Sequence, residues 1–150
     1  MSVAAAGVQT EVLRALAQAG VSDVDGSRLA RALYSSDASL YRVEPLAVVR
    51  PRDDDEVAAT VATAAALRVP VTSRGAGTSI AGNAVGPGIV LDFSRHMDRI
   101  LGVDPDAATA HVQPGVVQAS LQLAAAPHGL RFGPDPSTHN RATLGGMIGN

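Results

Sequence analysis

The pattern that most constrains the fold of this 150-residue chain is a valine-rich run, a capped helix and a second apolar run in that order. The first run, Leu46–Arg50, ends at Pro51 and has the composition of a buried strand. Asp53 follows, with Glu56 three residues on, which is the spacing of a capping box at a helix N-terminus. We therefore assign the acidic run to a helix start and not to a metal site. Strand, helix and strand together predict a right-handed parallel crossover.

Hydrophobic periodicity places the remaining elements. The helix is predicted to bury Val57, Val61 and Ala65 and to stop before Val69-Pro70. The sequence also predicts a turn at Asp104-Pro105-Asp106 between two hairpin strands, and a helix after it. Strands are predicted at Val71–Ser73, Gly88–Phe93, Ile100–Val103, Ala108–Val112 and Leu130–Phe132, and the later helix at Val116–Ala125.

The first third of the chain has helical periodicity in place of the alternation of strands and helices that follows it. Residues 2–33 have helical spacing, interrupted at Gly20 and around 23–26, and residues 34–44 form a polar connector. We expect a helical segment with its connector over residues 1–41 and a domain over residues 42–150. The fold class is predicted to be α+β, with two small α+β lobes meeting near Ser94–Arg99.

Composition excludes several functions. The chain has no cysteine, which removes disulfides, thiolate nucleophiles and iron–sulfur ligands from this stretch. All twelve basic residues are arginine, so a Schiff base and a Walker-type phosphate lysine are excluded. A net charge of −2 with 3% aromatic residues gives no footprint for nucleic acid. We find no membrane span or targeting segment and expect a cytoplasmic protein.

One glycine-rich loop, Arg74–Gly82, directly follows the strand predicted at 71–73. Its glycines allow positive φ angles and close approach of a ligand, so that successive N–H groups can converge on a phosphate. A Walker loop is excluded by the missing lysine, and a Rossmann loop by the residues after Gly82, which cannot form a helix. Phosphate binding and a plain chain reversal both remain open for this loop taken alone.

Two further segments carry candidate binding residues. The first, Gln113–Gly115, precedes a helix. The second runs from Gly133 to Asn150 and combines two stiffening prolines with a pair of glycines. In it, Thr143 is predicted to cap a short helix whose first turn holds Gly145 and Gly146, against which a flat ligand could lie.

The order of these three segments resembles the FAD-binding domain of the vanillyl-alcohol oxidase superfamily, also called the PCMH type. Within it the similarity is greatest to the glycolate oxidase, D-lactate and D-2-hydroxyglutarate dehydrogenase branch, and it covers about Tyr34 to Asn150. The resemblance implies that the chain is an N-terminal fragment of a longer enzyme that oxidises a D-2-hydroxy acid and passes electrons to an acceptor. The cofactor-binding residues it implies are Arg74, Gly75, Ala76, Gly77, Thr78, Ser79, Gly82, Pro114, Gly115, Pro134, Asp135, Ser137, Thr143, Leu144, Gly145, Gly146, Gly149 and Asn150.

The resemblance also implies how the flavin is held. Superfamily members that attach FAD covalently have a histidine late in the first loop, where this chain has Thr78, so a non-covalent FAD is expected. Any iron–sulfur cluster, metal ligand or substrate-side base would lie beyond this chain, and we assign no catalytic residue and no metal site. The four histidines are given turn or surface roles. Two rival functions remain open: an oxidase of another alcohol or of a sugar nucleotide in the same superfamily, and a non-catalytic nucleotide-binding module.

Overall fold

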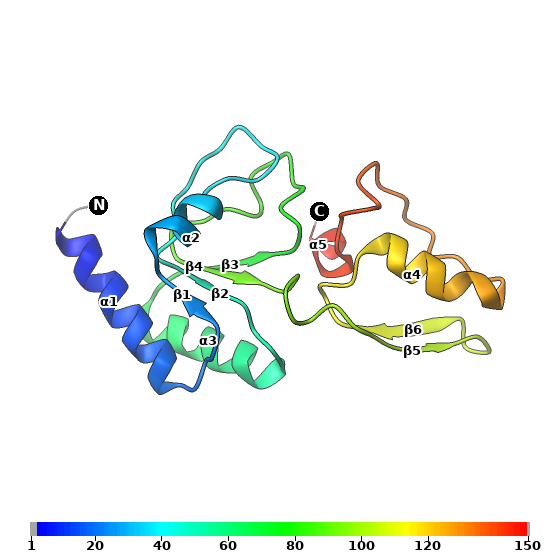
Figure 1. Ribbon diagram of the computed structural model, residues 1–150, viewed down its shortest axis with the longest axis horizontal. Helices are drawn as coiled ribbons and strands as arrows, with labels where there is room; N and C mark the ends of the chain where they lie inside the picture. The colour runs from blue at the N-terminus through cyan, green and yellow to red at the C-terminus, as the bar shows by residue number, and fades with distance from the viewer. Residues whose placement is uncertain (1–2, 150) are drawn as a thin grey trace.

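Three parallel strands form the centre of the first lobe. The computed structural model describes residues 3–149, and it places β4 (Ile89–Asp92) between β2 (Ala47–Val49) and β3 (Val71–Arg74). A two-residue strand, β1 (Val24–Asp25), pairs antiparallel with β2 and completes the order β1-β2-β4-β3. The predicted strands at 46–50, 71–73 and 88–93 are thus confirmed. The carboxyl ends of β3 and β4 point toward the second lobe (Figure 1).

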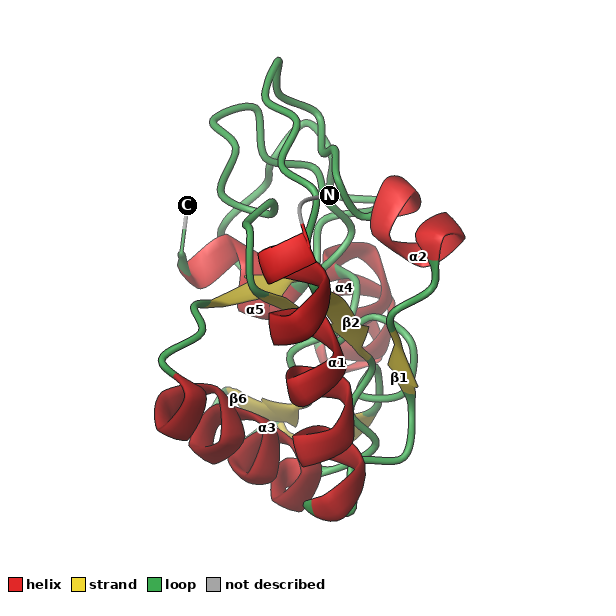
Figure 2. Ribbon diagram, turned by 90° about the vertical axis from the view of Figure 1, so that its left-hand side faces the viewer, coloured by secondary structure: helices red, strands yellow, loops and turns green. Residues whose placement is uncertain are grey.

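Two helices lie side by side against this sheet, α1 (Val3–Gln18) and α3 (Asp54–Leu67) (Figures 1 and 2). A shorter helix, α2 (Arg28–Leu33), follows β1. Val12 and Leu16 of α1 are fully buried in one cluster with β2 and β4. The N-terminal segment is therefore part of the first lobe, because it supplies both core side chains and the edge strand β1.

The predicted cap of α3 is confirmed, but of its predicted inward face only Val57 packs against the core. Asp53 accepts a hydrogen bond from the Glu56 N–H at 2.9 Å. Val61 and Ala65 are exposed, whereas the buried residues of this helix are Thr60 and Ala64. The prediction used steps of four residues only, and such a row drifts around the helix because one turn takes 3.6 residues.

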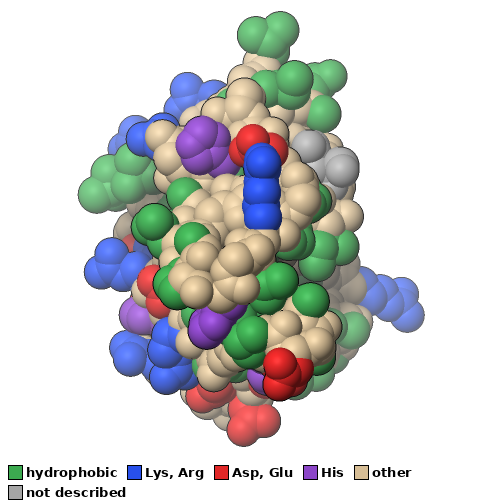
Figure 3. Space-filling view, turned by 90° about the vertical axis from the view of Figure 1, so that its right-hand side faces the viewer, with side chains coloured by type: hydrophobic (Ala, Val, Ile, Leu, Met, Phe, Trp, Pro, Cys, Tyr) green, Lys and Arg blue, Asp and Glu red, His purple; other side chains and the backbone are tan. Residues whose placement is uncertain are grey.

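The second lobe consists of a hairpin and short helices. Strands β5 (Ile100–Asp104) and β6 (Thr109–Val112) pair antiparallel as predicted, and α4 (Gln118–Ala125) packs near them. A 3₁₀ turn (Ala126–His128) ends α4, and α5 (Leu144–Ile148) closes the described chain. Val116, Leu121 and Leu144 form the small core of this lobe. Figure 3 looks onto this end of the molecule, where acidic, basic and histidine side chains are interspersed with apolar ones.

The strand predicted at Leu130–Phe132 is not formed. The backbone N–H of Phe132 donates to the side-chain oxygen of Gln122 at 3.0 Å, and the Phe132 carbonyl accepts from the amide of the same glutamine at 2.8 Å. The Gln122 side chain thus takes the place of a neighbouring strand, which a local pattern cannot reveal. Among residues 3–149 no helix is long and apolar enough to cross a membrane.

Candidate functional site

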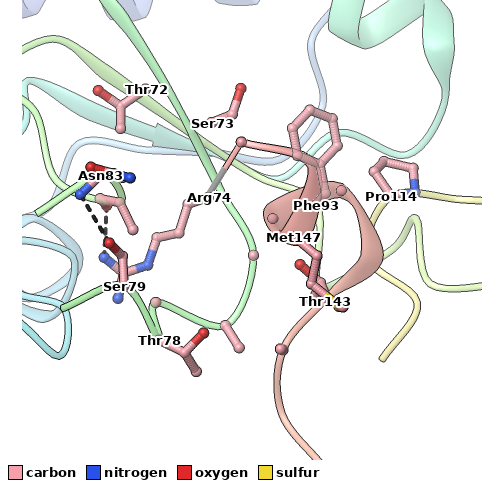
Figure 4. A pocket seen from close by; sticks show the side chains of 18 of the residues that line it. Thr72, Ser73, Arg74, Thr78, Ser79, Asn83, Phe93, Pro114, Thr143 and Met147 are labelled. Carbon is pink, nitrogen blue, oxygen red and sulfur yellow. Dashed lines mark hydrogen bonds between the residues drawn. The ribbon is translucent and has the colours of Figure 1, made fainter. Parts of the chain in front are cut away.

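A cavity of about 540 Å³ lies where the end of β3 meets the α5 segment. Figure 4 shows Arg74, Ser79 and Asn83 on one side of the glycine-rich loop, and Phe93, Thr143 and Met147 on the other. The cavity brings together the three segments that the sequence analysis described one by one: the glycine-rich loop, the segment around Pro114 and the segment that ends in α5. The predicted residues that line it are Arg74, Gly75, Ala76, Gly77, Thr78, Ser79, Pro114, Thr143, Gly145, Gly146 and Gly149.

The glycine-rich loop presents free backbone donors. Gly77 has φ +68° and Gly82 has φ +82°, both in the left-handed region that favours glycine. Within the described chain, none of the backbone N–H groups of residues 75–79 donates a hydrogen bond to another residue. Successive unpaired N–H groups around a left-handed residue form a concave site for an anion. The side chains of Thr78 and Ser79 add hydroxyl groups at the same edge of the cavity.

The α5 segment is held against this loop by close backbone contacts. A Cβ atom on Gly75 would collide with the side chain of Thr143, and one on Gly145 would lie 2.7 Å from Cβ of Pro114. The N–H groups of Leu144 and Gly145 donate to the carbonyls of Val116 and Pro114, at 2.8 and 2.9 Å. These two donors are therefore not available to a ligand, although the glycines still let one approach the backbone closely.

Thr143 stands at the N-cap of α5, but its side chain makes no capping hydrogen bond. The predicted cap is correct in position and wrong in mechanism. The side chain is buried and fills the space above Gly75, so it joins the two lobes at the cavity. A helix of only five residues has little stability of its own, and this one has no side-chain cap, so packing against the rest of the lobe stabilises it.

Several residues implied by the resemblance do not line the cavity. Gly115 is buried, and a Cβ there would collide with the carbonyls of Phe93 and Met97, so its role is close packing. Leu144 is in the second core, and Asp135 is exposed beside Arg131 at 3.2 Å. Asn150 lies outside the described residues. The others that do not line the cavity are Gly82, Pro134 and Ser137.

The cavity also has lining residues that sequence reasoning missed. Phe93 follows β4, the strand beside β3, and the carboxyl ends of neighbouring parallel strands meet at one edge of a sheet. That rule would have found Phe93 once the sheet order was known. Pro136 and Thr138 flank the predicted Ser137. The complete additional set is Val71, Thr72, Ser73, Asn83, Ala84, Val85, Phe93, Pro136, Thr138, Ala142 and Met147.

Tyr34 and Asp37 lie close to Arg74, and Asp92 is the hydrogen-bond partner of Tyr34. The Tyr34 hydroxyl donates to Asp92 at 2.5 Å, and burial together with this hydrogen bond raises the pKa of Tyr34 above its ordinary value. Burial alone would raise the pKa of Asp37, but hydrogen bonds from Ser39 and Ala84 and the charge of Arg74 outweigh it and lower that pKa. Tyr34 is therefore a hydrogen-bond donor and Asp37 an anion at neutral pH.

Comparison with known proteins identifies the class. Residues 45–150 match the family described as FAD binding domain. D-2-hydroxyglutarate dehydrogenase of Pseudomonas putida is 40% identical over 142 residues, which are 92% of this chain and 14% of that protein. Glycolate oxidase subunit GlcD of Bacillus subtilis is 39% identical over 132 residues, 86% of this chain and 28% of that protein. The chain thus spans 14% and 28% of the lengths of these two relatives.

A solved structure of alkyldihydroxyacetonephosphate synthase superimposes with a TM-score of 0.78 at 26% identity, covering 93% of this chain and 31% of that one. The chain belongs to the FAD binding domain family, and its two α+β lobes have the PCMH-type fold that the resemblance implied. Its relatives include a dehydrogenase and an oxidase subunit named for hydroxy acids.

Proposed function

We propose that this chain binds FAD non-covalently and forms the flavin-binding part of an oxidoreductase for a D-2-hydroxy acid. The observation that carries the proposal is the cavity that residues 75–79 line together with the glycines of the α5 segment, the N–H groups of 75–79 being unpaired within the described chain. The names of the relatives support the substrate class: one is a D-2-hydroxyglutarate dehydrogenase and another a glycolate oxidase subunit. The substrate is accordingly a small acid of the lactate, glycolate or 2-hydroxyglutarate type.

The residues present fit FAD. A cavity of about 540 Å³ lies within the range of ligand sites, roughly 300–1,000 Å³. The N–H groups of residues 75–79 suit the pyrophosphate, since they are donors without acceptors next to two hydroxyl side chains. Gly145 and Gly146 leave the backbone of α5 bare, so the flat ring can lie against it. Thr78 has no nucleophilic ring nitrogen, which is why we propose that no covalent link forms.

The contribution of this chain to the reaction is binding and orientation. When bound, FAD supplies an acceptor for the hydride from the α-carbon of the substrate. The glycine-rich loop fixes the pyrophosphate end of the cofactor, and Thr143 keeps that loop in register with α5. Phe93 and Met147 cover part of the cavity with apolar surface and keep water from it. The whole enzyme would also need a separate electron acceptor as a partner.

The cofactor proposal is tested by titrating the purified chain with FAD and following flavin fluorescence. We expect saturable binding and, after acid precipitation, all flavin in the supernatant, because no residue of the loop can attach it. Absence of saturable binding up to about 1 mM FAD, equivalent to about −4 kcal/mol, would overturn the proposal. Flavin that stays in the washed pellet would overturn its non-covalent part.

The substrate proposal is tested on the polypeptide that carries this domain at the length of its relatives. D-lactate, glycolate and D-2-hydroxyglutarate are added anaerobically, and bleaching of the flavin absorbance is measured. At least one of the three is expected to bleach the flavin. Bleaching by simple alcohols or sugars alone would indicate the alternative oxidase of the same superfamily, and flavin that no substrate bleaches would indicate a nucleotide-binding module.

A further inference from the structure

The guanidinium group of Arg74 packs against the glycine-rich loop and contacts three segments, at Ser36, Gly77 and Ala84. Its Nη1 donates to the carbonyls of Ser36 and Ala84, both at 3.0 Å. A Cβ atom on Gly77 would lie 2.5 Å from its Nη2, so the guanidinium packs directly against the turn of the loop. Figure 4 shows the side chain running from the end of β3 toward Ser79 and Asn83.

Tyr34 fixes the guanidinium from the other side. The centre of the guanidinium lies 5.1 Å from the centroid of the Tyr34 ring, within the range of a cation–π interaction. The Tyr34 hydroxyl is anchored on Asp92, which is 4% exposed at the end of β4. The second oxygen of Asp92 accepts from the backbone and the side chain of Ser94, at 2.8 and 2.7 Å. The ring therefore has a fixed position relative to the central strand of the sheet.

The loops around Arg74 also bond to one another. The N–H of Ala38 donates to the Gly77 carbonyl at 3.1 Å, and the N–H of Ala84 donates to the Asp37 carboxylate at 3.3 Å. Segments 34–38 and 83–84 thus brace the glycine-rich loop, and all of them meet at one guanidinium. The negative charge of Asp37 partly balances the positive charge of Arg74, which leaves less of it for a ligand.

We propose that Arg74 is a positioning residue, which holds residues 75–79 in their anion-binding conformation from beneath, and that Tyr34 holds Arg74. The pyrophosphate would then be bound by backbone N–H groups, with the arginine acting through them. This rests on the proposed function as far as FAD is concerned. The loop has this conformation without a ligand. The positioning role of Arg74 and the binding of FAD can therefore be tested separately.

Arginine is needed here because its planar guanidinium can donate to two carbonyls through Nη1, pack against Gly77 through Nη2 and stack on a ring at once, whereas lysine offers a compact charge. The variants are therefore Arg74→Lys, which keeps the charge, and Tyr34→Leu, which keeps bulk and removes the aromatic face. Tyr34 does not line the cavity. The matched control is Arg31→Lys: Arg31 is also buried, and its Nε donates to the Pro45 carbonyl at 2.8 Å, far along the chain from the glycine-rich loop.

The first measurement is amide hydrogen exchange of the flavin-free chain. In Arg74→Lys and Tyr34→Leu we expect faster exchange at the hydrogen-bonded amides around the loop, with unchanged protection in β2 and β4, and in Arg31→Lys no change at these amides. They are the amides of Ala38, Ala81, Asn83 and Ala84. Unchanged exchange of these amides in both variants would overturn the proposal. Because no flavin is present, this result does not depend on the proposed function.

The second measurement compares the affinities for FAD and for riboflavin, which lacks the pyrophosphate. Both variants are expected to bind FAD at least about tenfold more weakly than wild type, with little change for riboflavin, since loop geometry affects only the phosphate end. A direct phosphate contact instead predicts that Arg74→Lys retains FAD affinity and that Tyr34→Leu has no effect, which would overturn the proposal. If wild type binds no FAD, the proposed function fails while the exchange result still stands.

Tyr34→Phe is the conservative variant at this position, and if Tyr34→Leu does not fold, the comparison of Tyr34→Phe with Arg74→Lys decides the proposal. Tyr34→Phe retains the stacked ring and loses the hydroxyl group, which bonds to Asp92 and also interacts with Arg50, so it should keep most of the wild-type FAD affinity. An affinity for Tyr34→Phe as low as that of Arg74→Lys would contradict the role of the aromatic face.

Discussion

Gly77 and Gly129 have the same backbone dihedral, φ +68°, in different surroundings. Gly77 is in the glycine-rich loop against Arg74, whereas a Cβ on Gly129 would meet nothing within 4 Å. A valine at either position would strain the backbone by about 1–2 kcal/mol. We predict that Gly77→Val abolishes measurable FAD binding, because its side chain also displaces the loop that faces the phosphates.

Gly129→Val is the matched control for this prediction. It should lower the free energy of unfolding by a similar amount and leave FAD affinity unchanged, as measured by denaturant unfolding and flavin titration. Equal FAD affinity in the two variants would mean that the loop is only a chain reversal.

At the scale of elements, the short strand β1 is held in place by charged groups at its ends. Asp23 accepts from Arg50 at 2.8 Å and lies 2.9 Å from the Nε2 of His96, and Arg50 also lies 3.6 Å from Asp25. Burial would raise the pKa of Asp23, but the hydrogen bonds with His96 and Arg50 outweigh it and lower that pKa below 3.8. Hydrogen bonds from Ser27 chiefly lower the pKa of Asp25 as well.

The lowered pKa values of Asp23 and Asp25 determine how the free energy of unfolding changes with pH. A carboxyl group with a lower pKa in the folded state stabilises the fold above its unfolded pKa, and this contribution is lost as the pH falls through the folded pKa. We predict that the free energy of unfolding decreases from about pH 4 downward and that Asp23→Asn flattens this decrease. The variant should also cost up to about 1 kcal/mol at neutral pH, because the pair is only partly buried.

Urea unfolding from neutral pH down to about pH 3 measures both effects. Asp98→Asn, a change at an exposed aspartate, is the control and should leave the curve unchanged. A decrease with the same slope in Asp23→Asn and wild type would show that other carboxylates cause it.

At the scale of the whole molecule, the two lobes have cores of unequal size. Among the described residues, eight buried hydrophobic side chains form the core of the first lobe and three that of the second. Stability follows buried apolar area, so the second lobe should open more easily. We predict that amides in residues 100–149 exchange faster than those of β2 and β4, and that FAD slows exchange in both lobes because it contacts both. A single exchange rate throughout would contradict this.

A second prediction at this scale concerns the chain by itself. It spans 14% and 28% of the two relatives described above, and Ile148 beside the cavity is 89% exposed. We expect this chain to lose FAD during size-exclusion chromatography, to associate through exposed apolar surface, and to show no dehydrogenase activity. The same measurements on the longer polypeptide are the comparison, and a yellow, monodisperse and active 150-residue monomer would contradict the prediction.

The sequence by itself determined most strands, the cap at Asp53, the hairpin and the position of the glycine-rich loop, because each depends on hydrogen bonds or periodicity within a few residues. Only the tertiary structure decided that β4 lies between β2 and β3, that β1 exists, and that Thr143 fills the space above Gly75. It also decided the orientation of Arg74, which depends on Tyr34 and Asp92, a pair 58 residues apart in the chain. Such contacts are selected by how all the elements pack together, and no local pattern contains that information.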